Sequence, residues 1–85
     1  MAKYLITYDL KKTKDYPRLW NALGQLGACR ALLSVWLLRS NSSAVQIRDH
    51  LRSFIDADDK LLVAAMTGES AALNLSQAEV TCLKS

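Results

Sequence analysis

The sequence of 85 residues contains few of the residues from which metal sites and disulfide frameworks are built. It has one histidine, His50, and two cysteines, Cys29 and Cys82, and it contains no CxxC or HxxxH pair. This scarcity argues against a metal site based on Cys and His ligands. Two cysteines make no disulfide framework and we expect no signal peptide. We therefore predict a cytoplasmic protein in which both thiols are free and fill small spaces in the core.

Long apolar runs are also missing, although 51% of the residues are hydrophobic. The best candidate, residues 31–38, is too short to span a membrane and is interrupted by Ser34. We therefore expect no membrane partner. So much apolar surface in a small domain, which buries a smaller fraction of its surface than a large one, favours self-association.

Positive charge is concentrated in the amino-terminal half. Residues 1–39 carry seven bases against two acids, whereas the remainder carries four bases and six acids. A basic half is typical of a phosphate-binding surface. The alternative is a solvated lysine-rich loop, and charge alone favours this alternative. The residues that we predict to contact nucleic acid are Lys11, Lys12, Lys14, Arg18 and Arg30.

Strand and helix patterns alternate along the first part of the chain. Residues 4–10 are β-branched, aromatic and aliphatic and predict a first strand. Asp15 as N-cap, Pro17 in the first turn and Gly27 at the end delimit a first helix. Its apolar stripe consists of Tyr16, Leu19, Trp20, Leu23 and Leu26.

The middle of the chain is apolar on both faces of a predicted strand. Residues 28–40 are long for one strand and predict either a bent strand or two strands joined tightly near residues 34–36. Ser43 and Gln46 fit a capping box that begins a second helix. The inner stripe of that helix is Ile47, Leu51, Phe54 and Ile55. Residues 60–66 predict the next strand, residues 71–75 form either a further edge strand or an extended arm, and residues 77–85 stay unplaced.

This order predicts a single α+β domain over residues 1–85, with a core at about 1–68 and a carboxyl-terminal arm or tail at 69–85. If residues 28–40 form a hairpin, the order is βαββαβ, the ferredoxin-like sandwich. Its antiparallel sheet carries two helices on one face, and a terminal edge strand would be an addition. Because the chain has helices enough for only one face, we expect a two-fold homodimer to cover the other.

Asp9 is the anomaly of the first strand, because acids are disfavoured within strands and this one ends it. Ends of strands are common places for chemistry, since the loops there are free to vary. The residues alone leave two roles open for Asp9, a cap of the following turn or a metal ligand. Three later acids, Asp56, Asp58 and Asp59, form no competing calcium site, because they lack the Gly and the terminal Glu of an EF-hand loop.

Several short motifs, in this order and spacing, resemble the Cas-two family, the small CRISPR-associated protein of the spacer-acquisition complex. They are YLITYDL at residues 4–10, Cys29-Arg30, and Ser34-Val35-Trp36, where Trp36 replaces the usual Phe. Residues 47–51, 58–61 and 66–69 are similar to stand-alone bacterial relatives that are often labelled SinR-like. The resemblance covers about residues 1–75.

The resemblance implies a ferredoxin-like homodimer and a metal-dependent endonuclease acting on RNA or DNA. In such a dimer Asp9 of each subunit meets its twin near the two-fold axis, and the pair holds Mg²⁺ or Mn²⁺. The resemblance connects Tyr8, Arg30 and Trp36 with activity. Arg30 would bind phosphate through two donors. Trp36, which shares a motif with Ser34, would stack on a base or fill the dimer core.

Fold kinship does not carry chemistry with it, so two other functions stay open. In the acquisition complex the family member serves mainly as a bridge that grips DNA beside the CRISPR integrase subunit, which predicts a non-catalytic nucleic-acid-binding or assembly dimer. The VapD group shares the fold and suggests a toxin ribonuclease. The loop after Asp9 departs from the family, because it carries lysines where arginines are common and its Pro17 comes later.

Overall fold

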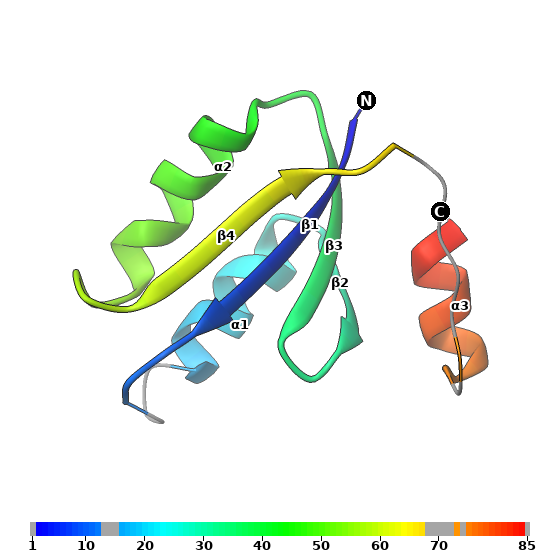
Figure 1. Ribbon diagram of the computed structural model, residues 1–85, viewed down its shortest axis with the longest axis horizontal. Helices are drawn as coiled ribbons and strands as arrows, with labels where there is room; N and C mark the ends of the chain where they lie inside the picture. Colours follow the sequence, from blue (N-terminus) through cyan, green and yellow to red (C-terminus); the bar gives the residue numbers. More distant parts are fainter. Residues whose placement is uncertain (1, 13–15, 68–72, 74, 85) are drawn as a thin grey trace.

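The computed structural model describes residues 2–12, 16–67, 73 and 75–84, and it places four strands and three α-helices among them (Figure 1). In chain order they are β1 (Ala2–Asp9), α1 (Tyr16–Gln25), β2 (Cys29–Leu32), β3 (Val35–Ser40), α2 (Ala44–Leu51) with a following 3-10 turn η2 (Arg52–Phe54), β4 (Lys60–Ala65) and α3 (Gln77–Lys84). The predicted α+β class is confirmed. The predicted helices and strands within residues 4–66 are present, and residues 28–40, for which one bent strand or two strands were predicted, contain two strands.

The strands form one open sheet in the order β2-β3-β1-β4, and every neighbouring pair is antiparallel. The long apolar segment is a hairpin, with Leu33 and Ser34 in the turn between β2 and β3. The register of that hairpin shifts between Arg30 and Leu32, which marks an irregularity in β2. β1 is a central strand and pairs with β3 on one side and β4 on the other. Both of its faces therefore have to be covered by other elements or exposed to solvent.

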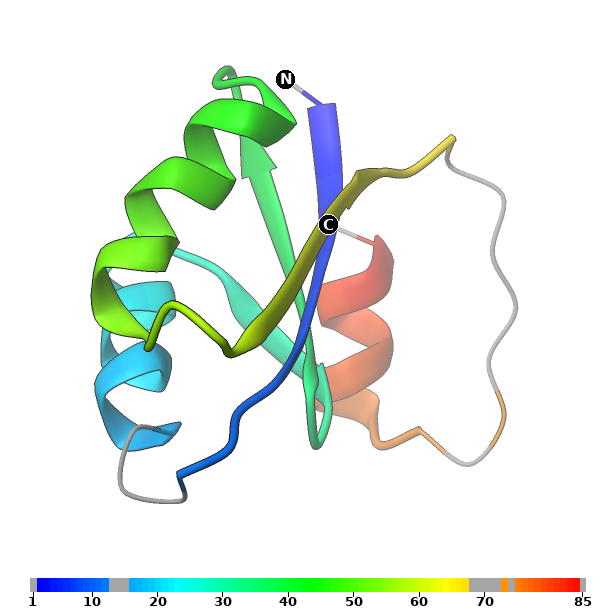
Figure 2. The same ribbon diagram turned by 60° about the vertical axis from the view of Figure 1, so that its left-hand side comes forward.

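α1 and α2 cover one face of the sheet, called here the inner face, as Figure 2 shows. The alternation of β1 explains this, since Tyr4, Ile6 and Tyr8 are buried while their neighbours are not. The main core consists of Tyr4, Ile6, Tyr8, Leu10, Leu19, Ala22, Leu23, Leu38, Ile47 and Leu51. The apolar stripes predicted for the two helices thus supply most of its helical side.

The ends of the first two helices follow their local sequence signals. Ser43 accepts a hydrogen bond from the backbone of Gln46, whose side chain accepts one in return, so the predicted capping box is confirmed. Gly27 has a φ of 87°, a conformation that suits glycine at the end of a helix. Asp15, the N-cap predicted for α1, lies outside the described residues.

The carboxyl-terminal segment, unplaced from the sequence, contains α3. The hydroxyl of Ser76 accepts from the backbone N–H of Glu79, and the carboxylate of Glu79 accepts from that of Ser76. This capping box begins the helix. Of the alternative strand or arm at residues 71–75, only Leu73 and Leu75 are described, and neither lies in a strand.

α3 lies on the opposite, outer face of the sheet beside β2, where Cys82 is joined to Cys29 by a disulfide with 6.0 Å between the Cα atoms. The prediction of two free thiols is therefore wrong. The physical reason is that the chain folds back, so that α3 packs beside β2 and brings together two cysteines that are 53 residues apart in sequence. No pattern in either segment predicts that return.

The outer face is only partly covered by the described residues. Beside α3 a small cluster forms from Ala31, Leu37 and Cys82, with Leu5, Cys29 and Met66 packed against it. Towards β4 the same face carries Leu62, whose relative exposure is 57%. No helix in the described ranges has the length and apolar character needed to cross a membrane.

Candidate functional site

Asp9 is the last residue of β1 and is exposed on the outer face of the sheet. Antiparallel pairing places it directly opposite Lys60 of β4, and Thr7 lies two residues away on the same face. A shallow hollow of about 240 Å³ is lined here by Thr7, Tyr8, Asp9, Lys60, Leu61 and Leu62. The predicted position of Asp9 at the carboxyl end of the strand is therefore confirmed. Whether it binds a metal stays a prediction.

Tyr8 precedes Asp9 but points to the opposite, inner face of the sheet. Its hydroxyl oxygen accepts two hydrogen bonds, from Nε1 of Trp20 at 2.6 Å and from Nε1 of Trp36 at 3.0 Å. Its ring also lies 5.9 Å from the ring of Tyr16. The structure thus separates the two predicted catalytic residues by the thickness of the sheet, because neighbours in a strand face opposite ways.

Trp36 and Ser34 of the Ser-Val-Trp motif also lie apart. Trp36 is half-buried against the main core, pairs with Ile6 across the strands and donates its indole N–H to Tyr8. Ser34 is exposed in the β2–β3 turn. Within the chain Trp36 is therefore a core residue of the inner face, whereas Ser34 is available to solvent.

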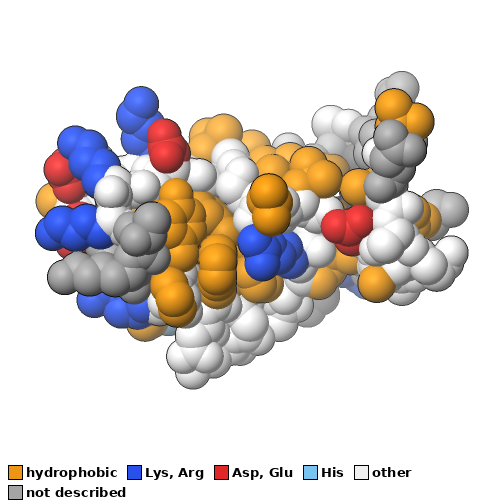
Figure 3. Space-filling view, turned by 90° about the horizontal axis from the view of Figure 1, so that it is seen from below, with side chains coloured by type: hydrophobic (Ala, Val, Ile, Leu, Met, Phe, Trp, Pro, Cys, Tyr) orange, Lys and Arg blue, Asp and Glu red, His pale blue; other side chains and the backbone are white. Residues whose placement is uncertain are grey.

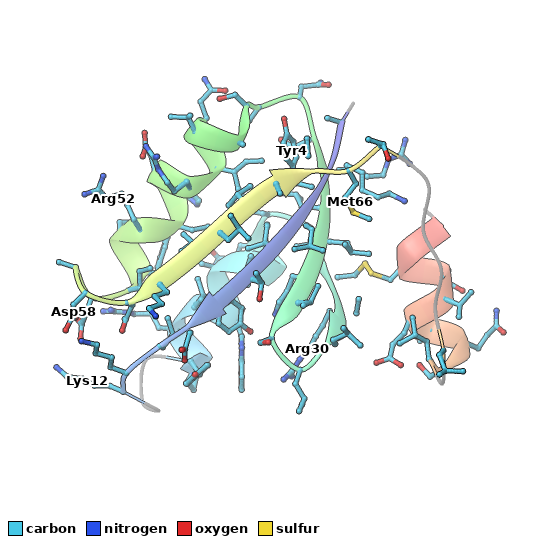
Figure 4. The ribbon with its side chains drawn as sticks, viewed as in Figure 1. Tyr4, Lys12, Arg30, Arg52, Asp58 and Met66 are labelled. Atoms are coloured by element: carbon cyan, nitrogen blue, oxygen red, sulfur yellow. A yellow bond between two sulfur atoms is a disulfide. The ribbon has the colours of Figure 1, made fainter. Side chains whose placement is uncertain are left out.

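The basic loop after β1 meets the acidic loop before β4. Nζ of Lys11 lies 3.0 Å from Oδ2 of Asp58, and Nζ of Lys12 lies 3.3 Å from Oδ2 of Asp56. Figure 4 shows Lys12 and Asp58 together at this end of the molecule. The hydrogen bond from Lys11 lowers the pKa of Asp58 below its ordinary value. Acids from the second half of the chain thus offset the basic character predicted for the first.

Asp59 joins the two loops through hydrogen bonds to their backbones. Its Oδ1 accepts the backbone N–H of Lys11 at 2.9 Å, and its Oδ2 accepts the backbone N–H of Asp56 at 2.9 Å. The sequence does not indicate this role, since three acids in four positions are distinguished only by the partners that the fold gives them. Both bonds are charge-assisted and fix where the loop leaves Asp9.

The two predicted arginines are engaged by the fold. Arg30 donates from Nε and Nη2 to the carbonyl of Leu33, at 3.2 and 2.9 Å, and its guanidinium lies 4.7 Å from the ring centroid of Trp20. Arg18 donates from Nε to the carbonyl of Phe54 at 2.8 Å. Arg30 as a whole is exposed. Lys14 lies outside the described residues.

Charged and apolar groups are both exposed in the view from below (Figure 3). Lysines and arginines mixed with acids gather at one end, and hydrophobic side chains fill the middle of this view. Exposed hydrophobic residues of the hairpin are Leu32 and Leu33. The hollow beside Asp9 is itself lined by both kinds of side chain, among them Lys60 and Leu62.

Within the described ranges, no group of three or more His, Cys, Asp or Glu side chains is close enough to hold a metal ion. Asp9 contributes a single carboxylate, and its partner across the strands is the cation Lys60. Magnesium can bind through one or two carboxylates together with water and phosphate, so the lack of a larger cluster among the described residues does not test Asp9, and its role as a ligand stays a prediction.

No protein-family model matches the chain, and no solved structure matches it either. The resemblance in the short motifs therefore remains a prediction from the sequence.

Proposed function

We propose that the protein is a Cas-two-like homodimer that binds RNA or DNA and cleaves it with the help of a divalent metal ion held by two Asp9 carboxylates. One observation carries the proposal. Asp9 is exposed at the end of β1 on the sheet face that the described residues cover only in part. A two-fold partner on that face would bring a second Asp9 next to the first.

The fold that we propose is the ferredoxin-like one. The element order β1-α1-β2-β3-α2-β4 and the sheet order β2-β3-β1-β4 support it, as do two helices on the inner face. Its sheet presents an open outer face, and here Leu62, opposite Thr7, and Leu32, opposite Val35, are both exposed. Burying these side chains favours association of two copies.

A pair of Asp9 carboxylates fits Mg²⁺ or Mn²⁺, which bind hard oxygen ligands and complete their coordination with water and phosphate. A bound ion of this kind supplies an activated water and neutralises charge on the phosphate. Lys60, opposite Asp9, would attract the phosphate backbone. Lys11 can exchange Asp58 for phosphate at little cost, because both side chains are well exposed.

The test is cleavage of single-stranded RNA and double-stranded DNA by the purified protein with Mg²⁺, Mn²⁺ or a chelator. We expect metal-dependent cleavage that Asp9→Asn abolishes. Asp49→Asn is the matched control, since Asp49 is an exposed acid on α2, on the other layer. Equal cleavage by Asp9→Asn and the wild type would refute the assignment of Asp9.

A second candidate is a non-catalytic dimer that binds nucleic acid or bridges an assembly such as one with a CRISPR integrase subunit. The separation of Tyr8 from Asp9 favours it, because the tyrosine hydroxyl is held between two indoles on the other face. Its signature is nucleic-acid binding that weakens steeply with salt, without cleavage in any metal. A cytoplasmic location belongs to both candidates and stays a prediction.

A further inference from the structure

We propose that the Cys29–Cys82 disulfide is a redox site for a dithiol reductant, and that its reduction releases α3 from the outer face of the sheet. The bond joins the last helix to β2 and is the only covalent tie between them in the described chain. Three features of its surroundings support the proposal: access, local charge and the weak packing of α3.

The disulfide borders an open cavity of about 270 Å³, which gives a small reductant access without unfolding of the sheet. The cavity is lined by Lys3, Gly27, Cys29, Leu37, Leu38, Arg39 and Cys82. Cys29 is half-buried, whereas Cys82 is only 7% exposed, so Cys29 is the more accessible residue of the pair. Figure 4 draws this bond between α3 and the sheet.

The charge around the cavity favours thiolate chemistry. Lys3 and Arg39 lie opposite each other in the β1–β3 pairing and line the same cavity as the two sulfurs. Cations attract an incoming thiolate and stabilise a departing one. A buried disulfide in a purely apolar site has neither advantage.

The reaction is ordinary thiol–disulfide exchange. One thiolate of the dithiol attacks Sγ of Cys29, forms a mixed disulfide and displaces Cys82 as a thiolate, which takes up a proton. The second thiolate of the reductant then attacks its own sulfur in the mixed disulfide and releases Cys29. Two electrons pass from the dithiol to the protein, giving one cyclic disulfide and two cysteine thiols.

The described side chains of α3 are mostly exposed or half-buried. The helix has eight residues, too few for stability in isolation. Among residues 75–82, whose side chains the structure describes, Cys82 is the one buried side chain. Once the bond is reduced, α3 loses the tie that keeps it near the sheet and its own capping box cannot sustain it.

Release of α3 would uncover Ala31, Leu37 and Leu5, which extend the apolar outer face towards β2. That face is where the proposed function places a second copy of the chain. Reduction would thus favour the dimer and oxidation the monomer. This consequence rests on the proposed dimer, whereas the redox site itself does not.

The test uses the oxidised full chain in native buffer, titrated with dithiothreitol. Alkylation followed by mass measurement counts the thiols, and hydrogen exchange reports on α3 and β1 separately. We expect both cysteines to be alkylated without denaturant and exchange in α3 to rise about tenfold or more, with β1 unchanged. Alkylation that needs denaturant, or α3 exchange that does not change on reduction, would overturn the proposal.

The double variant Cys29→Ser/Cys82→Ser provides a second measurement that needs no reductant. We expect fast exchange in its α3 and a protected β1; a protected α3 would contradict the proposal. If the variant does not fold, the titration of the wild type still decides. Sedimentation of the reduced wild type tests the dimer independently, so released α3 in a strictly monomeric protein would contradict the proposed dimer and leave the redox site intact.

Discussion

At the scale of single residues, the Tyr8 side chain of β1 connects two tryptophans of different elements. One hydroxyl oxygen accepts the indole N–H groups of Trp20 and Trp36, at 2.6 and 3.0 Å. Tyr8→Phe leaves both donors without this acceptor in a partly buried place. Because an unsatisfied donor costs more than a hydrogen bond contributes, we expect the free energy of unfolding to fall by about 2 kcal/mol.

Tyr4→Phe is the matched control for this substitution, since both tyrosines are 7% exposed on the same face of β1. The Tyr4 hydroxyl makes one hydrogen bond, to the carbonyl of Ser42 at 2.7 Å. We expect a loss of about 1 kcal/mol. Urea unfolding followed by circular dichroism measures both values, and a Tyr8→Phe variant no less stable than Tyr4→Phe would contradict the bridging role.

Residue positions were predictable from sequence where alternation in a strand decides them. The pattern of β1 was enough to put Asp9 at a strand end, and the same alternation places Tyr8 on the face opposite Asp9. It was not enough to distinguish Asp58, which pairs with Lys11 in solvent, from Asp59, which joins two loops. That difference depends on contacts 47 and 48 residues apart in sequence, which no local pattern reports.

At the scale of elements, α2 and α3 both begin with a capping box but differ in how they pack against the sheet. Ser43 and Gln46 form the capping box of α2, and Ser76 and Glu79 form that of α3. α2 buries Ile47 and Leu51 in the main core, so its formation is part of global folding. α3 packs through Cys82 on the outer face and is expected to open by itself.

Replacing each serine by alanine separates these two situations. Ser43→Ala removes a cap of a core helix, and we expect global stability to fall by about 1 kcal/mol. Ser76→Ala should leave global unfolding unchanged while amide exchange in α3 accelerates about fivefold. Circular dichroism and hydrogen exchange on the oxidised protein measure the two effects. Equal loss of global stability in both variants would show that α3 folds with the core.

The elements most accessible to sequence analysis were those with both a cap signal and an apolar stripe. α2 has both, and its predicted start was confirmed. α3 has the cap signal of Ser76 and Glu79, although residues 77–85 stayed unplaced from the sequence. A disulfide joins it to β2, and no local pattern in the sequence indicates that partner.

At the scale of the whole molecule, the unequal cover of the two sheet faces is the main physical problem. The inner face has two helices and a closed core, whereas the outer face has α3 beside β2 and exposed Leu62 on β4. The sequence predicted the imbalance, because residues 28–40 are apolar on both faces. It did not predict that the chain supplies part of the second cover itself.

A charged residue at position 62 tests whether two copies meet on the outer face. Leu62 lies opposite Thr7, and Thr7 is two positions before Asp9 on the same strand. The substitution Leu62→Glu would bury a charge at the proposed interface. We expect this variant to stay monomeric in sedimentation at concentrations where the reduced wild type forms dimers. Its circular dichroism should not change, since the side chain is 57% exposed in the single chain.

Val45→Glu is the control, because Val45 is 55% exposed on α2 and belongs to the helical layer. Both side chains also border a groove at the open edge of β4, so the pair of variants distinguishes two modes of association. Dimers of Val45→Glu but not of Leu62→Glu would support contact through the outer face. Loss of the dimer in both variants would place the contact at the β4 edge, where the two Asp9 carboxylates could not share an ion across the sheet faces. Association in both would remove the outer face from the interface altogether, and with it the geometric basis for a metal site built from two copies of β1.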